Sequence, residues 1–69
     1  MNMIPVASSN IAAVGYDYDG SILRIHFNSG WTYDYYNVPA SVYESLMNAP
    51  SKGSYHAYNI KNVYPYAKV

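Results

Sequence analysis

Two turn signals constrain the fold of this chain more than any other feature of its sequence. The first is Asp19-Gly20 between two apolar runs, which favours a two-residue type I′ hairpin because both central residues need positive φ. The second is Asn28-Ser29-Gly30, which favours a three-residue hairpin with a bulge and with Gly30 in the left-handed conformation. The residues between these turns would then be the middle strand of three.

The two turns independently assign the same face of this middle strand to the protein interior. The pairs expected across the inner face are Tyr16 with Leu23, Val14 with Ile25, Ala12 with Phe27, Phe27 with Trp31, Ile25 with Tyr33 and Leu23 with Tyr35. Since a slip of one residue would turn every side chain outward, the agreement of the two registers is informative. It predicts a three-stranded antiparallel meander near residues 11–17, 21–27 and 31–36.

The opposite face of the meander is expected to be open to solvent. Its residues would be Ala13, Gly15, Asp17, Arg24, His26, Thr32, Asp34 and Tyr36. Arg24 would lie opposite Asp34, a pairing that supports the register. We interpret Tyr36, with Arg24 and His26, as a candidate platform for a ligand. The small residues Ala13 and Gly15 would allow a second chain to pack closely on this face.

Two short helices are expected after the meander. Pro39 suits the first turn of a helix, and Pro50 ends that helix because it disfavours helical backbone at the residue before it. The apolar positions of this helix share one face: Val42, Tyr43, Leu46 and Met47. Ser51 can cap a second helix that runs to about Ile60, with either His56 or Ala57 toward the core. The predicted fold is therefore α+β, a three-stranded antiparallel β-meander covered on one face by two short C-terminal helices.

The length of 69 residues predicts one domain, residues 1–69. A domain of this size buries only about 60% of the surface of its unfolded chain and needs additional stabilisation. Disulfides are excluded because there is no cysteine, whereas ten tyrosines can supply bulky packing. Assembly into a homo-oligomer is the other expected source of stability.

A second candidate ligand site lies at the start of the second helix, at Ser51-Lys52-Gly53. Free N–H groups at a helix start, together with Lys52, can hold a phosphate or a carboxylate. Tyr58 and Lys61 would extend this patch. The alternative is structural, a capped helix start whose glycine packs closely against the sheet. Four basic and four acidic residues give a formal net charge of zero, which argues against an extensive phosphate-binding surface.

Catalytic and metal-binding patterns are weak in this sequence. His26 and His56 are far apart, and we expect one surface and one packed histidine with no metal and no cofactor. Asp17 and Asp19 flank a turn, which explains Asp19, and a magnesium site is the alternative. The chain is therefore predicted to be a binding domain and not an enzyme. It has no apolar run long enough to span a membrane and no signal-peptide pattern, so no membrane partner and a cytoplasmic location are expected.

An ordered set of segments resembles the KTSC domain over nearly the whole chain. The matching segments are Ser8-Ser9-Asn10-Ile11, Gly15-Tyr16-Asp17, Tyr33-Asp34-Tyr35-Tyr36-Asn37-Val38-Pro39, Val42-Tyr43-Glu44-Ser45-Leu46, Ala49-Pro50-Ser51-Lys52-Gly53-Ser54-Tyr55, Ile60 and Tyr64-Pro65-Tyr66. The resemblance implies a domain found at the C-terminus of some lysyl-tRNA synthetases and as stand-alone bacterial and phage proteins. The chain departs from the family pattern at His56-Ala57, where relatives typically have Phe-Asn. If that asparagine contacts a ligand in relatives, the contact is lost here.

Two functions follow as hypotheses from the resemblance and the composition. The first is a module that binds RNA or a nucleotide. The alternative is a phage or prophage accessory module that engages a host protein, or that sequesters a nucleotide ligand as an oligomer. The neutral surface and the many aromatic residues, which are common at protein interfaces, favour the alternative.

Overall fold

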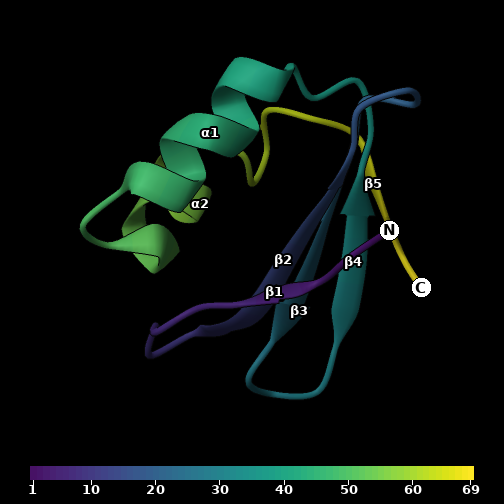
Figure 1. Cartoon of the computed structure of the whole chain (residues 1–69). Coiled ribbons are helices and arrows are strands. Elements are labelled where there is room, and N and C mark those ends of the chain that lie inside the picture. Colours follow the sequence, from purple (N-terminus) through teal and green to yellow (C-terminus); the bar gives the residue numbers. More distant parts are fainter.

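The computed structural model describes all 69 residues as one antiparallel sheet with two helices beside it (Figure 1). In chain order the elements are β1 (Ile4–Pro5), β2 (Ile11–Asp17), β3 (Ile22–Phe27), β4 (Thr32–Tyr35), α1 (Ala40–Asn48), α2 (Lys52–Asn59) and β5 (Tyr66–Lys68). The strand order in the sheet is β1-β2-β3-β4-β5. Neither helix has the length and apolar composition needed to cross a membrane.

The α+β class and the two helices are confirmed, but the prediction of three strands is wrong. Two short edge strands complete the sheet: Ile4 of β1 lies opposite Val14, and Tyr66 of β5 lies opposite Tyr35. Strands of two and three residues are too short to produce a periodic pattern. Pro5 is tolerated in β1 because an edge strand does not need every N–H for pairing.

The register of the central strands is confirmed. Leu23 lies opposite Tyr35, and Ile25 lies opposite both Val14 and Tyr33. At the second turn the Phe27 N–H donates to the Trp31 carbonyl, and Gly30 has a φ of +104°.

Two local details of the first hairpin differ from the prediction. The turn spans four residues instead of two, and its positive φ belongs to Ser21, at 54°, because the Asp17 carboxylate accepts the Asp19 N–H and starts a different turn. At the far end, a bulge places Ile11 opposite Phe27, where Ala12 was expected. The bulge buries the larger Ile11 side chain completely.

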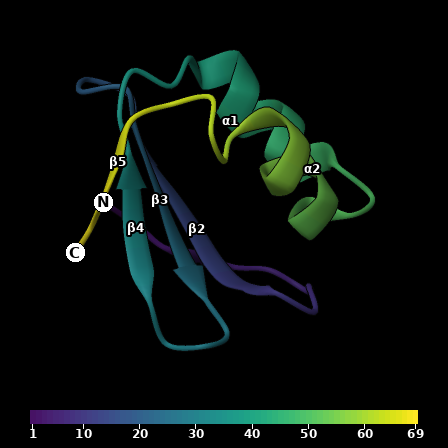
Figure 2. The ribbon, with the colours of Figure 1, turned by 180° about the vertical axis from the view of Figure 1, so that it is seen from behind.

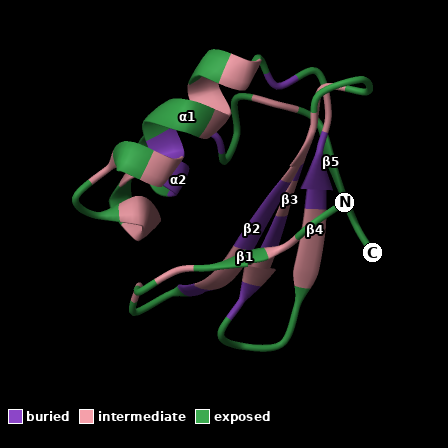
Figure 3. Cartoon of the chain, in the orientation of Figure 1, coloured by how far each residue is buried: buried purple, intermediate pink, exposed green.

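The core lies between the inner sheet face and the helices (Figure 3). Its buried apolar members are Ile11, Val14, Leu23, Ile25, Phe27, Tyr35, Val38, Leu46 and Ile60. Tyr33 packs against this core and is partly buried, so the inward placement of both Tyr33 and Tyr35 is confirmed.

The outer sheet face is not fully open as predicted. The N-terminal segment crosses it (Figure 1), and Gly15 is buried beneath that segment. A Cβ atom at Gly15 would lie 2.6 Å from the Met3 sulfur and 3.0 Å from the Asn2 carbonyl oxygen. The chain's own N-terminal segment therefore occupies the space that was expected to accept a second chain, and self-association stays a prediction.

Candidate ligand-binding pocket

A pocket of about 380 Å³ is lined by residues of the β3–β4 hairpin, β5 and α2. Figure 2 shows the ribbon of these elements from behind. This volume falls at the small end of the range of ligand sites, about 300–1,000 Å³, and suits a single ring system with a substituent. The lining residues are Asn10, Phe27, Ser29, Trp31, Tyr33, Tyr35, Gly53, His56, Ala57, Lys61 and Tyr66.

Aromatic rings form most of the pocket wall. The centroid of the Tyr33 ring lies 5.8 Å from that of Phe27 and 5.6 Å from that of Tyr66, both in edge-to-face orientation. Trp31 stands at the rim and is 52% exposed. Rings that pack against one another lose little freedom when a ligand binds, so this wall is preformed for a flat aromatic group.

A buried hydrogen-bonded pair lines the same pocket. The Tyr35 hydroxyl and His56 Nε2 are 2.7 Å apart, and the two residues are 3% and 6% exposed. Burial, followed by the positive charge of Lys61, lowers the pKa of His56. Burial and the neighbouring Tyr33 and Tyr66 raise the pKa of Tyr35 to about 12. The pair is therefore uncharged at neutral pH.

The lowered pKa of His56 predicts a loss of stability in mild acid. The unfolded chain binds a proton at His56 near pH 6.5, whereas the folded chain resists it, so the unfolded state takes up more protons as the pH falls. We expect the free energy of unfolding, measured with urea, to decrease from about pH 7.5 to about pH 5. A His56→Phe variant should show a smaller decrease. An equal decrease in both proteins would assign the effect to another group.

Two lysines beside the pocket have no acidic partner. Lys61 lines the pocket, and the Lys68 ammonium lies 3.7 Å from the centroid of the Trp31 ring. The ion pair in the structure joins Arg24 to Asp34, on the other side of the sheet. Both lysines are exposed and available to an anion.

The charges of the molecule are separated although its net charge is zero. Once Arg24 and Asp34 neutralise each other, the remaining acids are Asp17, Asp19 and Glu44. Asp17 ends β2, and Asp19 lies in the β2–β3 turn. Glu44 lies near this turn, because its carboxylate, after desolvation, is a cause of the raised pKa of Tyr18. That turn is separated from the β3–β4 turn by the length of β3, roughly 17 Å. Lys61 and Lys68 therefore lie at the pocket end, and the three side-chain carboxylates outside the ion pair lie toward the opposite end.

Comparison with known proteins places this chain in a family. Residues 7–64 match the sequence pattern of the KTSC domain. The chain belongs to the KTSC domain family. The crystal structure of a KTSC domain protein from Yersinia pestis matches this domain with a TM-score of 0.94 at 38% identity, covering 99% of this chain and 96% of that one.

Relatives of this KTSC domain include small proteins and part of a larger enzyme. A protein from Tsukamurella paurometabola is 47% identical over 53 residues, covering 77% of this chain and 79% of that protein. A lysine–tRNA ligase from Nostoc sp. is 41% identical over 61 residues. The match covers 88% of this chain but 11% of the ligase.

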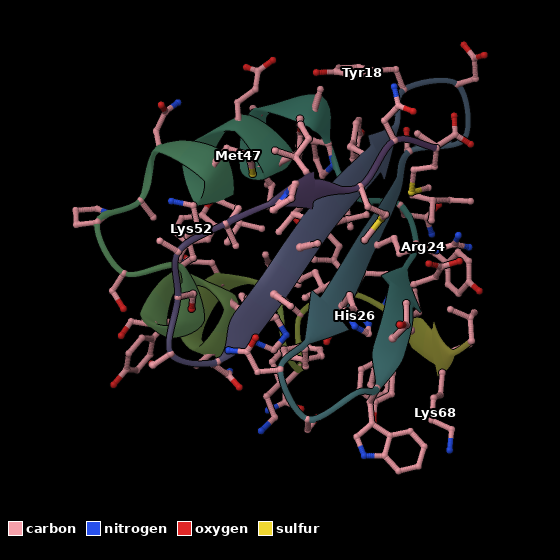
Figure 4. The ribbon with its side chains drawn as sticks, turned by 60° about the horizontal axis from the view of Figure 1, so that its bottom comes forward. Tyr18, Arg24, His26, Met47, Lys52 and Lys68 are labelled. Atoms are coloured by element: carbon pink, nitrogen blue, oxygen red, sulfur yellow. The ribbon has the colours of Figure 1, made fainter.

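The candidate residues on the outer face of the KTSC domain lie away from the pocket. Arg24 is engaged with the buried Asp34 through two hydrogen bonds, Nε to Oδ1 at 2.7 Å and Nη2 to Oδ2 at 2.9 Å. His26 Nδ1 lies 2.8 Å from the Thr32 hydroxyl. Tyr36 is partly buried and near enough to Arg24 to favour its charged form. Arg24 and His26 point away from the helices (Figure 4).

The candidate residues of α2 separate into two sets. Gly53 and Lys61 line the pocket. Ser51 caps α2 by accepting the Ser54 N–H at 3.3 Å, and Lys52 Nζ donates to the Ala49 carbonyl at the end of α1, at 3.2 Å. Tyr58 is 84% exposed and is not among the lining residues. The expected cluster at the start of α2 is thus divided between helix capping and the pocket.

Sequence reasoning missed several of the pocket residues. Trp31 was expected to face inward opposite Phe27, and Lys68 and Tyr66 had no predicted role. Their grouping depends on β5, which was not predicted as a strand. A cluster of three or more His, Asp or Glu side chains that could hold a metal ion is absent.

Proposed function

We propose that this KTSC domain is a binding module for a nucleotide unit, a flat base joined to a phosphate. The observation that carries the proposal is the pairing of an aromatic pocket with two lysines that have no acidic partner. In this proposal the base inserts among the rings, and the phosphate stays at the rim beside Lys61 and Lys68. Stacking on aromatic side chains contributes about 1–3 kcal/mol per base.

The relatives favour RNA as the source of the nucleotide. One relative is a lysine–tRNA ligase, a protein whose name includes tRNA as a substrate. A free mononucleotide offers the same base and phosphate, so an experiment has to separate the two sources. The small number of available cations fits a site for one nucleotide better than a long nucleic-acid track.

The direct test uses Trp31, the one tryptophan of the chain, as a fluorescent reporter at the rim of the pocket. The domain would be titrated with AMP, with thymidine monophosphate and with a short single-stranded RNA of mixed sequence. Saturable quenching by all three supports the proposal, and tighter binding of the oligonucleotide identifies RNA as the source. If none of the three changes the emission at millimolar concentration, the proposal is wrong and a protein partner becomes the better hypothesis.

The dependence of binding on salt gives a quantitative prediction. For the RNA oligonucleotide, each phosphate neutralised on a single strand contributes about −0.7 to the slope of log K against log salt concentration, so one phosphate contact from each of the two lysines predicts a slope of about −1.4. Lys61→Gln and Lys68→Gln should each reduce the magnitude of the slope by about half. Lys52→Gln is the matched control, because the ammonium of Lys52 donates to the Ala49 carbonyl. An effect of the Lys52 variant as large as the other two would contradict the assignment.

A further inference from the structure

The pocket wall contains a buried hydrogen-bonded pair, Tyr35 and His56, in addition to the polar side chains Asn10, Ser29 and Lys61. The face of α2 that lines the pocket consists of Gly53, His56 and Ala57, which are spaced three and four residues apart. Gly53 and Ala57 carry no side chain beyond a methyl group. The imidazole is therefore not covered by its neighbours on the helix.

His56 also retains an unpaired ring nitrogen. Its Nε2 atom is bound to the Tyr35 hydroxyl, and no hydrogen bond of Nδ1 is present. No buried side-chain nitrogen or oxygen lacks a hydrogen-bond partner in this structure. Nδ1 is therefore in contact with solvent, although the residue as a whole is 6% exposed.

The pair offers a ligand one further hydrogen-bonding group in either tautomeric arrangement. If the Tyr35 hydroxyl donates to Nε2, then Nδ1 carries the proton and is a donor. If Nε2–H donates to the Tyr35 oxygen, then Nδ1 is an acceptor and the hydroxyl proton can point elsewhere. In both arrangements a ring without polar atoms would exclude water from Nδ1 and leave Nδ1 without a hydrogen-bond partner.

We infer that the Tyr35–His56 pair determines specificity, so that the pocket selects a ring with a hydrogen-bonding edge over a hydrocarbon ring of the same shape. This inference rests on the proposed nucleotide function and specifies which part of the ligand enters first. The ring edge meets the uncharged pair inside the pocket, while the phosphate remains outside with Lys61 and Lys68. Because the uncharged pair would meet the ring and the two lysines the phosphate, the ligand would have a single favoured orientation.

The test compares two ligands that differ in hydrogen bonding and not in shape. Thymidine monophosphate would be titrated against the analogue in which difluorotoluene replaces thymine, with Trp31 emission as the readout. The wild-type domain should bind the thymine compound at least about tenfold more tightly, since leaving a buried polar group unsatisfied is costly. The double variant Tyr35→Phe/His56→Phe removes both polar groups, keeps an aromatic ring at each position, and should bring the ratio of the two affinities to within about twofold.

The ratio of affinities distinguishes a specificity role from a structural one, because partial unfolding weakens the binding of both ligands equally. Equal binding of the two ligands by the wild-type domain would overturn the inference and leave the nucleotide proposal standing. A tenfold preference that persists in the double variant would assign the selection to other residues. If the wild-type domain binds neither ligand, the inference is wrong; if it also fails to bind AMP and RNA, the proposed function is wrong as well.

Discussion

Replacement of Ile25 with alanine should lower the free energy of unfolding by about 2–5 kcal/mol. Ile25 is completely buried at the centre of β3, between Val14 and Tyr33 of the neighbouring strands. Truncation removes apolar contacts and leaves a cavity that the surrounding rings cannot fill. A domain of this length has a total stability of about 3–10 kcal/mol, so the variant should lose a large share of it. Unfolding in urea, followed by circular dichroism, measures the change.

Ile22 of the same strand provides the matched control. It is partly exposed and lies on the outer side of β3, so that Ile22→Ala removes the same atoms from a different environment. We expect it to lower the free energy of unfolding by less than about 1.5 kcal/mol. Equal losses in the two variants would contradict the assignment of the inner and outer faces of the sheet.

Replacement of Trp31 with alanine should weaken nucleotide binding by about 5- to 150-fold. This range corresponds to the loss of one stacking contact, about 1–3 kcal/mol. Trp31 is half exposed at the rim, so its truncation should have little effect on folding. Because the variant lacks the fluorescent reporter, its affinity would be measured by calorimetry.

Tyr58 is the control for this experiment because it is the most exposed of the large apolar side chains and does not line the pocket. Tyr58→Ala should change the affinity by less than about twofold, within the usual range of surface substitutions. Loss of binding in the Tyr58 variant, with retention in the Trp31 variant, would move the site to the outer surface of α2. That result would favour the patch that the sequence suggested around the start of the helix.

The central sheet could be predicted because two separate turns specify one register. Ile25 lies two strand positions from Leu23 and Phe27, and both turns direct all three inward. The edge strands could not be predicted in this way. β1 and β5 are two and three residues long and are held by pairing with β2 and β4, which is a tertiary interaction without a local pattern.

The pocket could be predicted only in part, because some of its residues are brought together by strand pairing that has no local sequence pattern. Gly53 and Lys61 were selected as candidates from the helix-start motif, and both line the pocket. Lys52 belongs to the same motif, but its ammonium donates to the end of α1. Lys68 meets Trp31 because β5 pairs with β4, and no sequence pattern indicates that contact.

His56 illustrates what the sequence can and cannot specify at one position. Helical spacing left a choice between His56 and Ala57 for the core, and the structure buries His56 and exposes Ala57. The hydrogen bond to Tyr35 could not be predicted, because it joins residues from β4 and α2. His56 thus places a polar group in an aromatic pocket.

The location of the ligand is tested most directly by a two-dimensional amide NMR spectrum of the domain recorded during titration with AMP. If nucleotides enter the pocket, the signals of Gly53, Ala57, Lys61 and the Trp31 indole should move together and saturate. Shifts confined to Arg24, His26 and Tyr36 would place the ligand on the outer face of the sheet and would contradict the account.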